Sequence, residues 1–432
     1  MVLKLSAQQS GFKADFAAFL TTKREVSTDV IADVEKIIAH VVENGDDALH
    51  DLTLKFDKLD TRKVGLTITS DELDEAFEKT PENVRDALQF AHERITKHHA
   101  RQMPKDDFYI DDLGVELGSR WTAIDAVGLY VPGGTASYPS SVLMNAVPAK
   151  VAGVERVVMV APARNGELNS AVLAAARIAG VDEIYRIGGA HAIAALAYGT
   201  QTISPVAKIV GPGNAWVAAA KRQVFGTVGI DMIAGPSEVL IIADKNNNPE
   251  WVAADLLAQA EHDVGAQAIL ITDSQDLADQ VELAVQGQIK ALPRGAIAAQ
   301  SWADFGAIIL VPTIMDAFPL ANQIAAEHLE LALDNADDYV QHVRNAGAIF
   351  VGHYTPEAIG DYVAGSNHVL PTARSARFSS GLSVYDFIKR TSVLKLGSEQ
   401  LAALGPFAMT LAETEGLGAH ARSISIRMNA RG

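Results

Sequence analysis

The sequence predicts an α/β fold with two parallel-sheet units, and three observations lead to this prediction. Short apolar runs alternate with amphipathic helical patterns through most of the chain after residue 126. Glycine-rich turns follow several of these runs, where a strand would pass into a helix. The chain has 432 residues and is 48% hydrophobic, which is more apolar material than one core usually absorbs.

The part of the chain before residue 126 is expected to be mainly helical. Residues 1–22 form a short arm. Residues 27–29 offer an N-cap, and apolar side chains then recur at helical spacing until Gly45 ends the helix. A capping box at residues 69–72 opens another helix, and Pro81 stands at the start of a third.

The following segments alternate between strands and helices, which is typical of parallel sheets. Strands are expected at residues 127–131, 157–161, 183–187, 208–210 and 239–243, and then at 268–272, 307–311, 329–333 and 348–351. The last part of the chain forms a tail with helices near residues 399–404 and 407–415 and a strand-like segment at residues 423–427.

These elements predict two Rossmann-like parallel-sheet domains, one inserted in the other. The early helical segment is expected to pack on the second α/β unit. The predicted organisation is an arm at 1–22, a main α/β domain at 23–129 and 243–382, an inserted nucleotide-binding domain at 130–242, and a tail at 383–432.

Composition narrows the possible partners and chemistry. The formal net charge of −17 disfavours a nucleic-acid partner, because such proteins carry a basic footprint. The chain has no cysteine, so any metal must be held by histidine, carboxylate or amide groups. There is no apolar segment suited to spanning a membrane and no signal-peptide pattern, so the cytoplasm is the expected location.

The stretch WVAADLLAQAEHD, residues 251–263, predicts a helix that carries a possible metal site. Gln259 and His262 lie three positions apart and project from the same face. An amide oxygen and an imidazole nitrogen can both hold a divalent metal, although further ligands must come from elsewhere. Alone, such a pair is more often a surface feature. Distant segments supply matching groups, namely Glu327 with His328, Asp361 with His368, and His420.

Glycine-rich turns follow three expected strands of the inserted domain, at residues 131–134, 187–190 and 210–214. Glycine lets a ligand approach the backbone, and the helix N-terminus that follows favours an anionic group. Such turns at the ends of neighbouring parallel strands line one crevice. None of them is a GxGxxG fingerprint, and glycine that merely makes tight turns is the alternative.

The pair Glu327-His328 stands at an element boundary, where a carboxylate and an imidazole can act together as a base. Alone, an exposed helix end is the simpler interpretation. Asp361 is a possible ligand, although a lone aspartate in a loop is usually a turn former. His420 is relevant only if the tail folds back onto a site of its own chain or of a partner.

Taken together, these segments closely resemble the histidinol dehydrogenases. The matching stretches keep their order and spacing across about 300 residues. They are GLYVPGGTASYPSSVLMNAVPAKVAGV (128–154), GGAHAIAALAYGT (188–200), VGPGNAWVAAAKRQV (210–224), DMIAGPSEVLI (231–241), DLLAQAEHD (255–263), AAEHLEL (325–331), GDYVAGSNHVLPT (360–372) and EGLGAHARSISIR (415–427).

The resemblance implies an enzyme that oxidises L-histidinol to L-histidine through the aldehyde, in histidine biosynthesis. It also implies one zinc ion per site, NAD as hydride acceptor, and a homodimer that is held by the tail. The zinc ligands would be Gln259, His262, Asp361 and, from the neighbouring subunit, His420.

The resemblance assigns roles to the other site residues as well. The acid–base pair would be Glu327 and His328. Substrate would be held by Ser237, His368 and Glu415, together with the zinc ligands and His328. NAD would be contacted by Tyr130, Asn214 and His191, the last standing where the family usually has glutamine. This departure puts the third NAD contact in doubt, because histidine reaches less far than glutamine.

Two alternative functions remain open at this stage. A paralogue could oxidise another polar alcohol with NAD, although Glu415 and His368, which would distinguish substrates, are both present. A non-catalytic protein that binds nucleotide or metal would not need the Glu327-His328 pair.

Overall fold

The computed structural model describes residues 2–21, 28–133, 138–163, 166, 168–233 and 235–428. The predicted N-cap position 27 lies outside the described residues, as do residue 134, the last of the first glycine-rich turn, and residues 135–137 after it. The chain divides into two compact units, the first comprising Met1–Arg101 with Asp125–Phe387 and the second Gln102–Ile124 with Ile388–Gly432.

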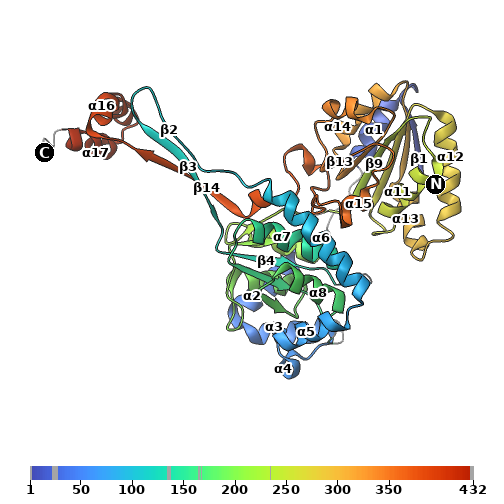
Figure 1. The fold of residues 1–432 in the computed structure, drawn as a ribbon, viewed down its shortest axis with the longest axis horizontal. Helices are drawn as coiled ribbons and strands as arrows, with labels where there is room; N and C mark the ends of the chain where they lie inside the picture. The colour runs from blue at the N-terminus through green and yellow to red at the C-terminus, as the bar shows by residue number, and fades with distance from the viewer. Residues whose placement is uncertain are drawn as a thin grey trace. The chain divides into compact units, whose positions relative to one another are not determined.

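A five-stranded parallel sheet forms the first half of the larger unit (Figure 1). Its strand order is β6-β5-β4-β7-β8. The strands are β4 (Ala126–Tyr130), β5 (Arg156–Val160), β6 (Glu183–Tyr185), β7 (Lys208–Val210) and β8 (Gly229–Ile230). The helices between them are α7 (Pro139–Val151), α8 (Ser170–Ala179), α9 (Gly189–Tyr198) and α10 (Ala215–Val224). The order reverses between β4 and β7, which is where open parallel sheets bind ligands.

A six-stranded parallel sheet forms the second half, in the order β1-β11-β10-β9-β12-β13. Its strands are β1 (Leu3–Ser6), β9 (Glu238–Ala243), β10 (Gln267–Thr272), β11 (Ala307–Leu310), β12 (His328–Ala332) and β13 (Ala348–Val351). One face is covered by α1 (Phe12–Thr21) and α14 (Ala317–Ile324). The other is covered by α11 (Pro249–Ala260), α12 (Gln275–Gln288) and α13 (Gly295–Phe305). A short helix, α15 (Glu357–Tyr362), follows β13.

The two predicted parallel sheets are therefore confirmed, and every predicted strand of both sheets is present within a few residues. Both faces of these strands are covered, so they are continuous apolar runs that are readable in the sequence. The predicted arm is partly integrated into the fold, because β1 pairs with β11 at the edge of the six-stranded sheet.

The early helices pack differently from the expectation. They are α2 (Thr28–Asn44), α3 (Asp46–Asp57), α4 (Thr61–Val64), α5 (Ser70–Lys79) and α6 (Glu82–Ala100). Val34 and Val41 of α2 share a core with the five-stranded sheet, and α6 packs on α7 and α8. The expectation that this segment packs on the second α/β unit is wrong, because helical periodicity reveals an apolar face and not its partner.

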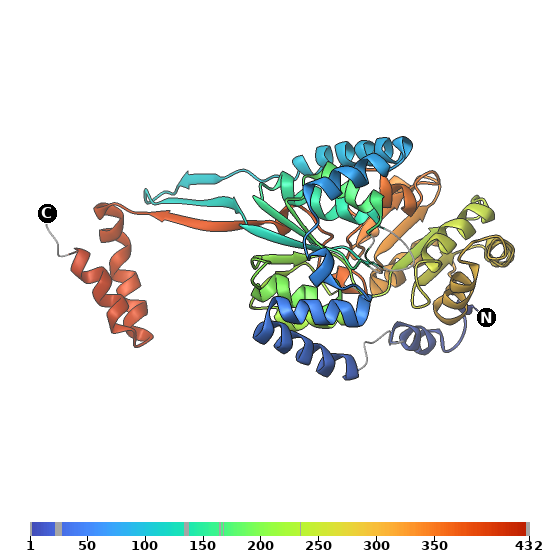
Figure 2. The ribbon, with the colours of Figure 1, turned by 90° about the horizontal axis from the view of Figure 1, so that it is seen from below.

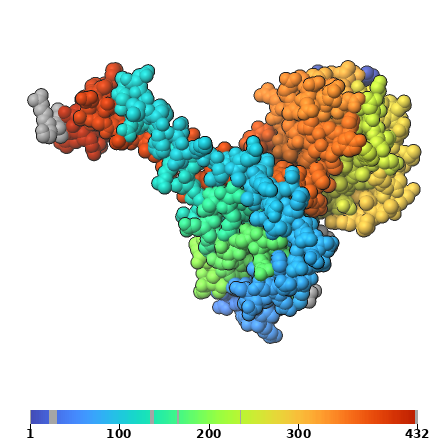
Figure 3. Space-filling view, viewed as in Figure 1, coloured from blue at the N-terminus to red at the C-terminus, as the bar shows by residue number. Residues whose placement is uncertain are grey.

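The smaller unit is built from segments that are far apart in the sequence, the hairpin that follows α6 and the C-terminal segment (Figures 2 and 3). The hairpin strands β2 (Asp107–Ile110) and β3 (Glu116–Ala123) join β14 (Ile388–Lys395) in an antiparallel sheet. Two helices, α16 (Ser398–Thr414) and α17 (Gly418–Met428), pack against each other.

Two predictions for the tail are wrong. The helices expected at 399–404 and 407–415 are one helix, because α16 continues through Pro406. The strand-like segment at 423–427 belongs to α17. The alternation of serine and isoleucine there imitates a strand, but the segment packs on α16 at Gly405, where any side chain would collide with Met428 and Ile424.

No helix in the described part of the chain combines the length and the apolar character that crossing a bilayer demands.

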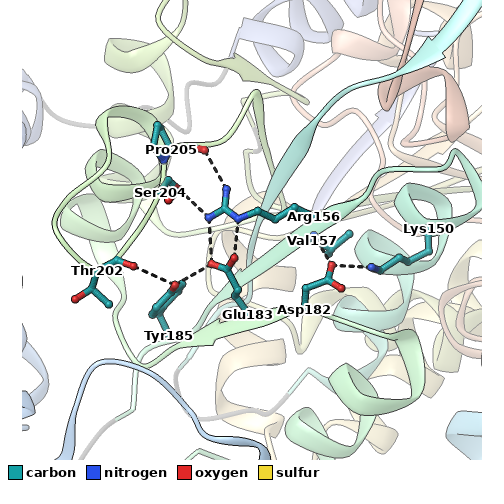
Figure 4. A network of polar contacts seen from close by, with 9 residues as sticks. All are labelled: Lys150, Arg156, Val157, Asp182, Glu183, Tyr185, Thr202, Ser204 and Pro205. Carbon is teal, nitrogen blue, oxygen red and sulfur yellow. Dashed lines mark hydrogen bonds and ion pairs between the residues drawn. The ribbon is translucent and has the colours of Figure 1, made fainter.

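A polar network joins neighbouring strands at one end of the five-stranded sheet (Figure 4). Arg156 donates hydrogen bonds to both carboxylate oxygens of Glu183, at 2.7 and 3.1 Å, and to the carbonyl oxygens of Ser204 and Pro205. Tyr185 donates to Glu183 at 2.8 Å. These hydrogen bonds, with Arg156 contributing most, lower the pKa of the Glu183 carboxyl.

This network predicts a stability effect that depends on pH. Replacing Glu183→Gln should reduce the free energy of unfolding by about 1–2 kcal/mol, the low end for hydrogen bonds to a charged group, because Glu183 is partly exposed. Since folding lowers the pKa of Glu183 below 4.5, the difference should be present above that pH and shrink as the pH falls. Urea denaturation between acidic and neutral pH measures it. Glu155→Gln, at an exposed neighbouring position, is the control. Equal losses in both variants would contradict the assignment.

Candidate active site

The two sheets contribute opposite edges to one cavity of about 450 Å³. The five-stranded sheet contributes the carboxyl ends of β4 and β7, represented by Tyr130 and Gly211. The six-stranded sheet contributes the amino ends of β9 and β12, represented by Ser237 and His328. Because α11 runs antiparallel to β9, its last turn returns to the same amino edge and brings Gln259 there.

Nine of the twelve predicted site residues line this cavity. They are Tyr130, Asn214, Ser237, Gln259, His262, Glu327, His328, Asp361 and His368. They come from segments separated by up to 238 positions, so the fold, and not local sequence, brings them together.

His328 opens β12 and is 3% exposed, so it is not the exposed helix end that its position also suggested. Its Nδ1 lies 3.0 Å from the carbonyl oxygen of Glu238 in the neighbouring strand. A carbonyl only accepts, so Nδ1 carries hydrogen and Nε2 is the nitrogen that can take up a proton. Nε2 lies 3.5 Å from Oδ1 of Asp361. Burial opposes protonation of this imidazole, but the charges of Glu357, Glu327 and Asp361 outweigh it and raise the His328 pKa.

Glu327 precedes His328 and is also buried, at 5% exposure. Its Oε2 accepts a hydrogen bond of 2.9 Å from the backbone N–H of Glu238. Burial raises the pKa of Glu327 to about 7, although the positive charge of His328 and this hydrogen bond oppose the shift. A carboxyl that titrates near neutral pH suits proton transfer.

Asp361 lies in the last turn of the short helix α15, and the segment after this helix returns His368 to the same site. His368 Nδ1 lies 2.9 Å from the carbonyl oxygen of Asp361, and Nε2 lies 3.3 Å from Oγ of Ser141. Burial lowers the pKa of His368, and the loss of water around its imidazole lowers the pKa of His262, although that residue as a whole is exposed. Burial also opposes ionisation of Asp361, but the hydrogen bond and charge of His328, with smaller contributions from His368 and His262, leave the Asp361 pKa lowered.

These shifts favour neutral imidazoles beside an ionised carboxylate, which is the protonation state that metal ligands require. Gln259 is fully buried on α11, and His262 follows one turn later. Gln259, His262 and Asp361, three of the four residues predicted to hold zinc, all line the cavity.

The loop after β7 forms another side of the cavity. Lys221 forms a buried ion pair with Asp231 and donates to the carbonyl oxygen of Gly211, while Asp231 accepts from the Gly211 N–H. Asn214 caps α10 by accepting from the N–H groups of two residues in its first turn. The loop is therefore held from both sides. The Tyr130 hydroxyl accepts a hydrogen bond of 3.1 Å from the N–H of Gly189.

Three predicted residues do not line the cavity. His191 is fully buried in α9, where Nε2 lies 3.3 Å from Oγ1 of Thr53 and the ring stacks on Phe56. Burial lowers its pKa to about 4, so it is neutral. Glu415 and His420 belong to the smaller unit, at the end of α16 and the start of α17, and both are exposed there.

Several buried carboxylates near the cavity were not predicted from the sequence. Glu238, Glu330 and Glu357 are each 3% exposed. His328, Glu357 and Asp361 present ligand atoms that lie within 4.8 Å of one another. The spacing of Glu357 and Asp361, one helical turn apart, is a signal that could have pointed to Glu357.

Two parallel sheets that meet at a cavity with buried imidazoles and carboxylates define an α/β enzyme. Residues 20–428 match the family described as "Histidinol dehydrogenase". Curated proteins with that name from Agrobacterium fabrum and Rhizobium meliloti are 70% and 67% identical over 99% of each chain. The crystal structure of histidinol dehydrogenase from Elizabethkingia anophelis is similar, with a TM-score of 0.95, 35% identity and coverage of 99% of this chain and 98% of that one.

The chain belongs to the histidinol dehydrogenase family, and it is an oxidoreductase.

Proposed function

We propose that this enzyme oxidises L-histidinol to L-histidine through L-histidinaldehyde, with NAD as the hydride acceptor and one zinc ion per site. The observation that carries this proposal is the convergence of Gln259, His262 and Asp361 with the Glu327-His328 pair on one cavity beside the glycine-rich loops.

The donor set fits zinc. Gln259 offers an amide oxygen, His262 a neutral imidazole and Asp361 a carboxylate, which are ligand types that zinc accepts. In this proposal His420 of a second copy completes the set. When bound, zinc supplies a positive centre that orients the amino alcohol, and NAD supplies the hydride acceptor.

His328 would serve as the base in the first oxidation. Its Nδ1–H is engaged by the Glu238 carbonyl, and Nε2, which has no hydrogen-bond partner among the described residues, can take the hydroxyl proton. Asp361 lies beside Nε2 and stabilises the imidazolium that forms, because opposite charges at this distance attract strongly in a buried site.

Glu327 would serve in the second oxidation, for which the aldehyde must be hydrated. Its carboxyl titrates near neutral pH, so it can accept a proton from the attacking water. The chain contains no cysteine, so a covalent thiol intermediate is excluded.

A homodimer would place His420 and Glu415 of one copy at the site of the other. The smaller unit supports this part of the proposal by its exposed apolar side chains. Phe407 is 73% exposed, Ile110 67% and Leu411 64%. An exposed apolar surface of this kind is typical of a protein interface.

The activity itself is tested with purified, zinc-loaded protein. L-histidinol and NAD should yield NADH, a chelator should abolish the reaction, and zinc should restore it. No NADH formation from histidinol by the zinc-loaded protein would reject the proposed function.

Replacing His328→Asn tests the proposed base. The rate should fall by about 10²–10⁴-fold, because positioned proton transfer contributes that much, while zinc content stays unchanged. Steady-state kinetics and metal analysis measure both quantities. His40→Asn, on α2 away from the cavity, is the control. Unchanged turnover of His328→Asn would contradict the role.

Subunit mixing tests the shared site. Gln259→Ala and His420→Asn homodimers should each be inactive, but a heterodimer should contain one intact site. Random exchange should restore about a quarter of the original activity, because half of the dimers are mixed and each has one working site. Absence of rescue in verified heterodimers would show that His420 acts within its own chain.

A further inference from the structure

A cluster of buried polar side chains lies next to the proposed metal site, where α11, α15 and β12 meet. Asp255 and Gln259 are one helical turn apart on α11, and Glu357 and Asp361 are one turn apart on α15, so each pair shares a helix face. α11 packs against α15. Glu330 projects from β12 between them, because its carboxylate accepts from the N–H of Glu357 and interacts with Asp255.

The Glu357 carboxylate determines which way the Gln259 amide points. With its nitrogen toward Glu357, the Gln259 amide donates to both carboxylate oxygens, at 2.6 and 3.1 Å. Burial raises the pKa of Glu357 to about 8, although the positive charge of His328 opposes this shift. With Glu357 ionised, the opposite orientation would place the amide oxygen against two acceptors. Gln259 is fully buried, so solvent is not available to compensate. The bidentate pair therefore directs the amide oxygen away from Glu357.

This orientation matters because only the amide oxygen can bind a cation. The amide nitrogen has no available lone pair and presents hydrogens. A glutamine that is free to turn would present the wrong atom part of the time, and metal affinity would fall accordingly. Outer-shell partners of this kind are known to tune metal sites.

Glu357 is itself held in place. Its backbone N–H donates to Oε1 of Glu330 at 2.6 Å, and its side chain is 3% exposed. Its Oε1 also lies 3.8 Å from Nδ1 of His328. The residue thus touches the amide of one proposed metal ligand and approaches the proposed base, although it does not line the cavity itself.

We propose that Glu357 is a positioning residue that fixes the Gln259 amide with its oxygen toward the metal. This inference rests on the proposed function, in which Gln259 is a zinc ligand.

The experiment measures zinc affinity of the full-length protein, by competition with a chromophoric chelator and without substrate. Glu357→Gln replaces one of the two acceptors by a donor, so either orientation of Gln259 becomes possible. Zinc affinity should fall by about 10-fold or more, within the range known for outer-shell partners. Glu330→Gln is the matched control, because it replaces a carboxyl by an amide at an equally buried position but retains an acceptor for the Glu357 N–H. Its zinc affinity should stay close to that of the unaltered protein.

Equal affinities of the Glu357→Gln and Glu330→Gln variants would overturn the inference, whether both remain high or both fall. Gln259→Ala separates this failure from failure of the proposed function. If Gln259→Ala binds zinc as tightly as the unaltered protein, the ligand assignment is wrong. If only Gln259→Ala loses zinc affinity, Gln259 is a zinc ligand and the positioning role of Glu357 is wrong.

Thermal unfolding of the zinc-free variants establishes that each protein is folded. If Glu357→Gln does not fold, Glu357→Asp can be tested in its place. Aspartate keeps the carboxylate but is one methylene group shorter, so both acceptor oxygens move away from the Gln259 amide. Its zinc affinity should lie between those of the unaltered protein and Gln259→Ala, and an unchanged affinity would overturn the inference.

Discussion

The hydrogen bond between His328 Nδ1 and the carbonyl oxygen of Glu238 is the interaction on which the site depends. It joins the first residues of two neighbouring parallel strands, β12 and β9, at the edge that faces the cavity. Because the carbonyl fixes the tautomer, it leaves Nε2 as the only nitrogen of this ring that can exchange a proton there. A rigid sheet holds the imidazole, whereas a loop would hold it with less accuracy.

The protonation states of the groups around His328 depend on where the sheet holds its imidazole. A buried imidazole costs less to protonate when carboxylates lie close by, and buried carboxylates cost less to ionise beside a cation. Asp361 and Glu327 lie on different sides of the His328 ring, and their pKa values move in opposite directions, downward for Asp361 and up to about 7 for Glu327. Groups with such divergent pKa values provide an acid and a base within one site.

The sequence was sufficient for the parts of the fold that are encoded locally. Buried parallel strands are apolar runs, and helix starts such as the capping box of Thr69 and Glu72 carry their own signal. The smaller unit was not predicted, because β14 pairs with β3 across more than 260 positions and neither strand has a continuous apolar run. The partner of an amphipathic helix is likewise not a local property, which explains the error in packing the early helices.

In the site, too, locally encoded features could be predicted from the sequence and features of the tertiary structure could not. Adjacent or turn-spaced residues such as Glu327-His328 and Gln259-His262 could be recognised as pairs, and the family resemblance supplied the distant members. Glu330 could not be identified, because a glutamate is exposed by default and only the tertiary structure shows that it is buried. For Glu357, the one signal in the sequence is its spacing of one helical turn from Asp361. His191 was expected to contact NAD; in the structure it is buried in α9, with Nε2 3.3 Å from Oγ1 of Thr53 and the ring stacked on Phe56.

A crystal structure of the zinc-loaded protein with L-histidinol would show whether the proposed ligands meet at a single ion. We expect one ion at about 2.0–2.2 Å from the amide oxygen of Gln259, an imidazole nitrogen of His262 and the carboxylate of Asp361. Zinc held instead by the separate group of Asp244, Asp334 and His353, with the cavity residues unligated, would contradict this expectation.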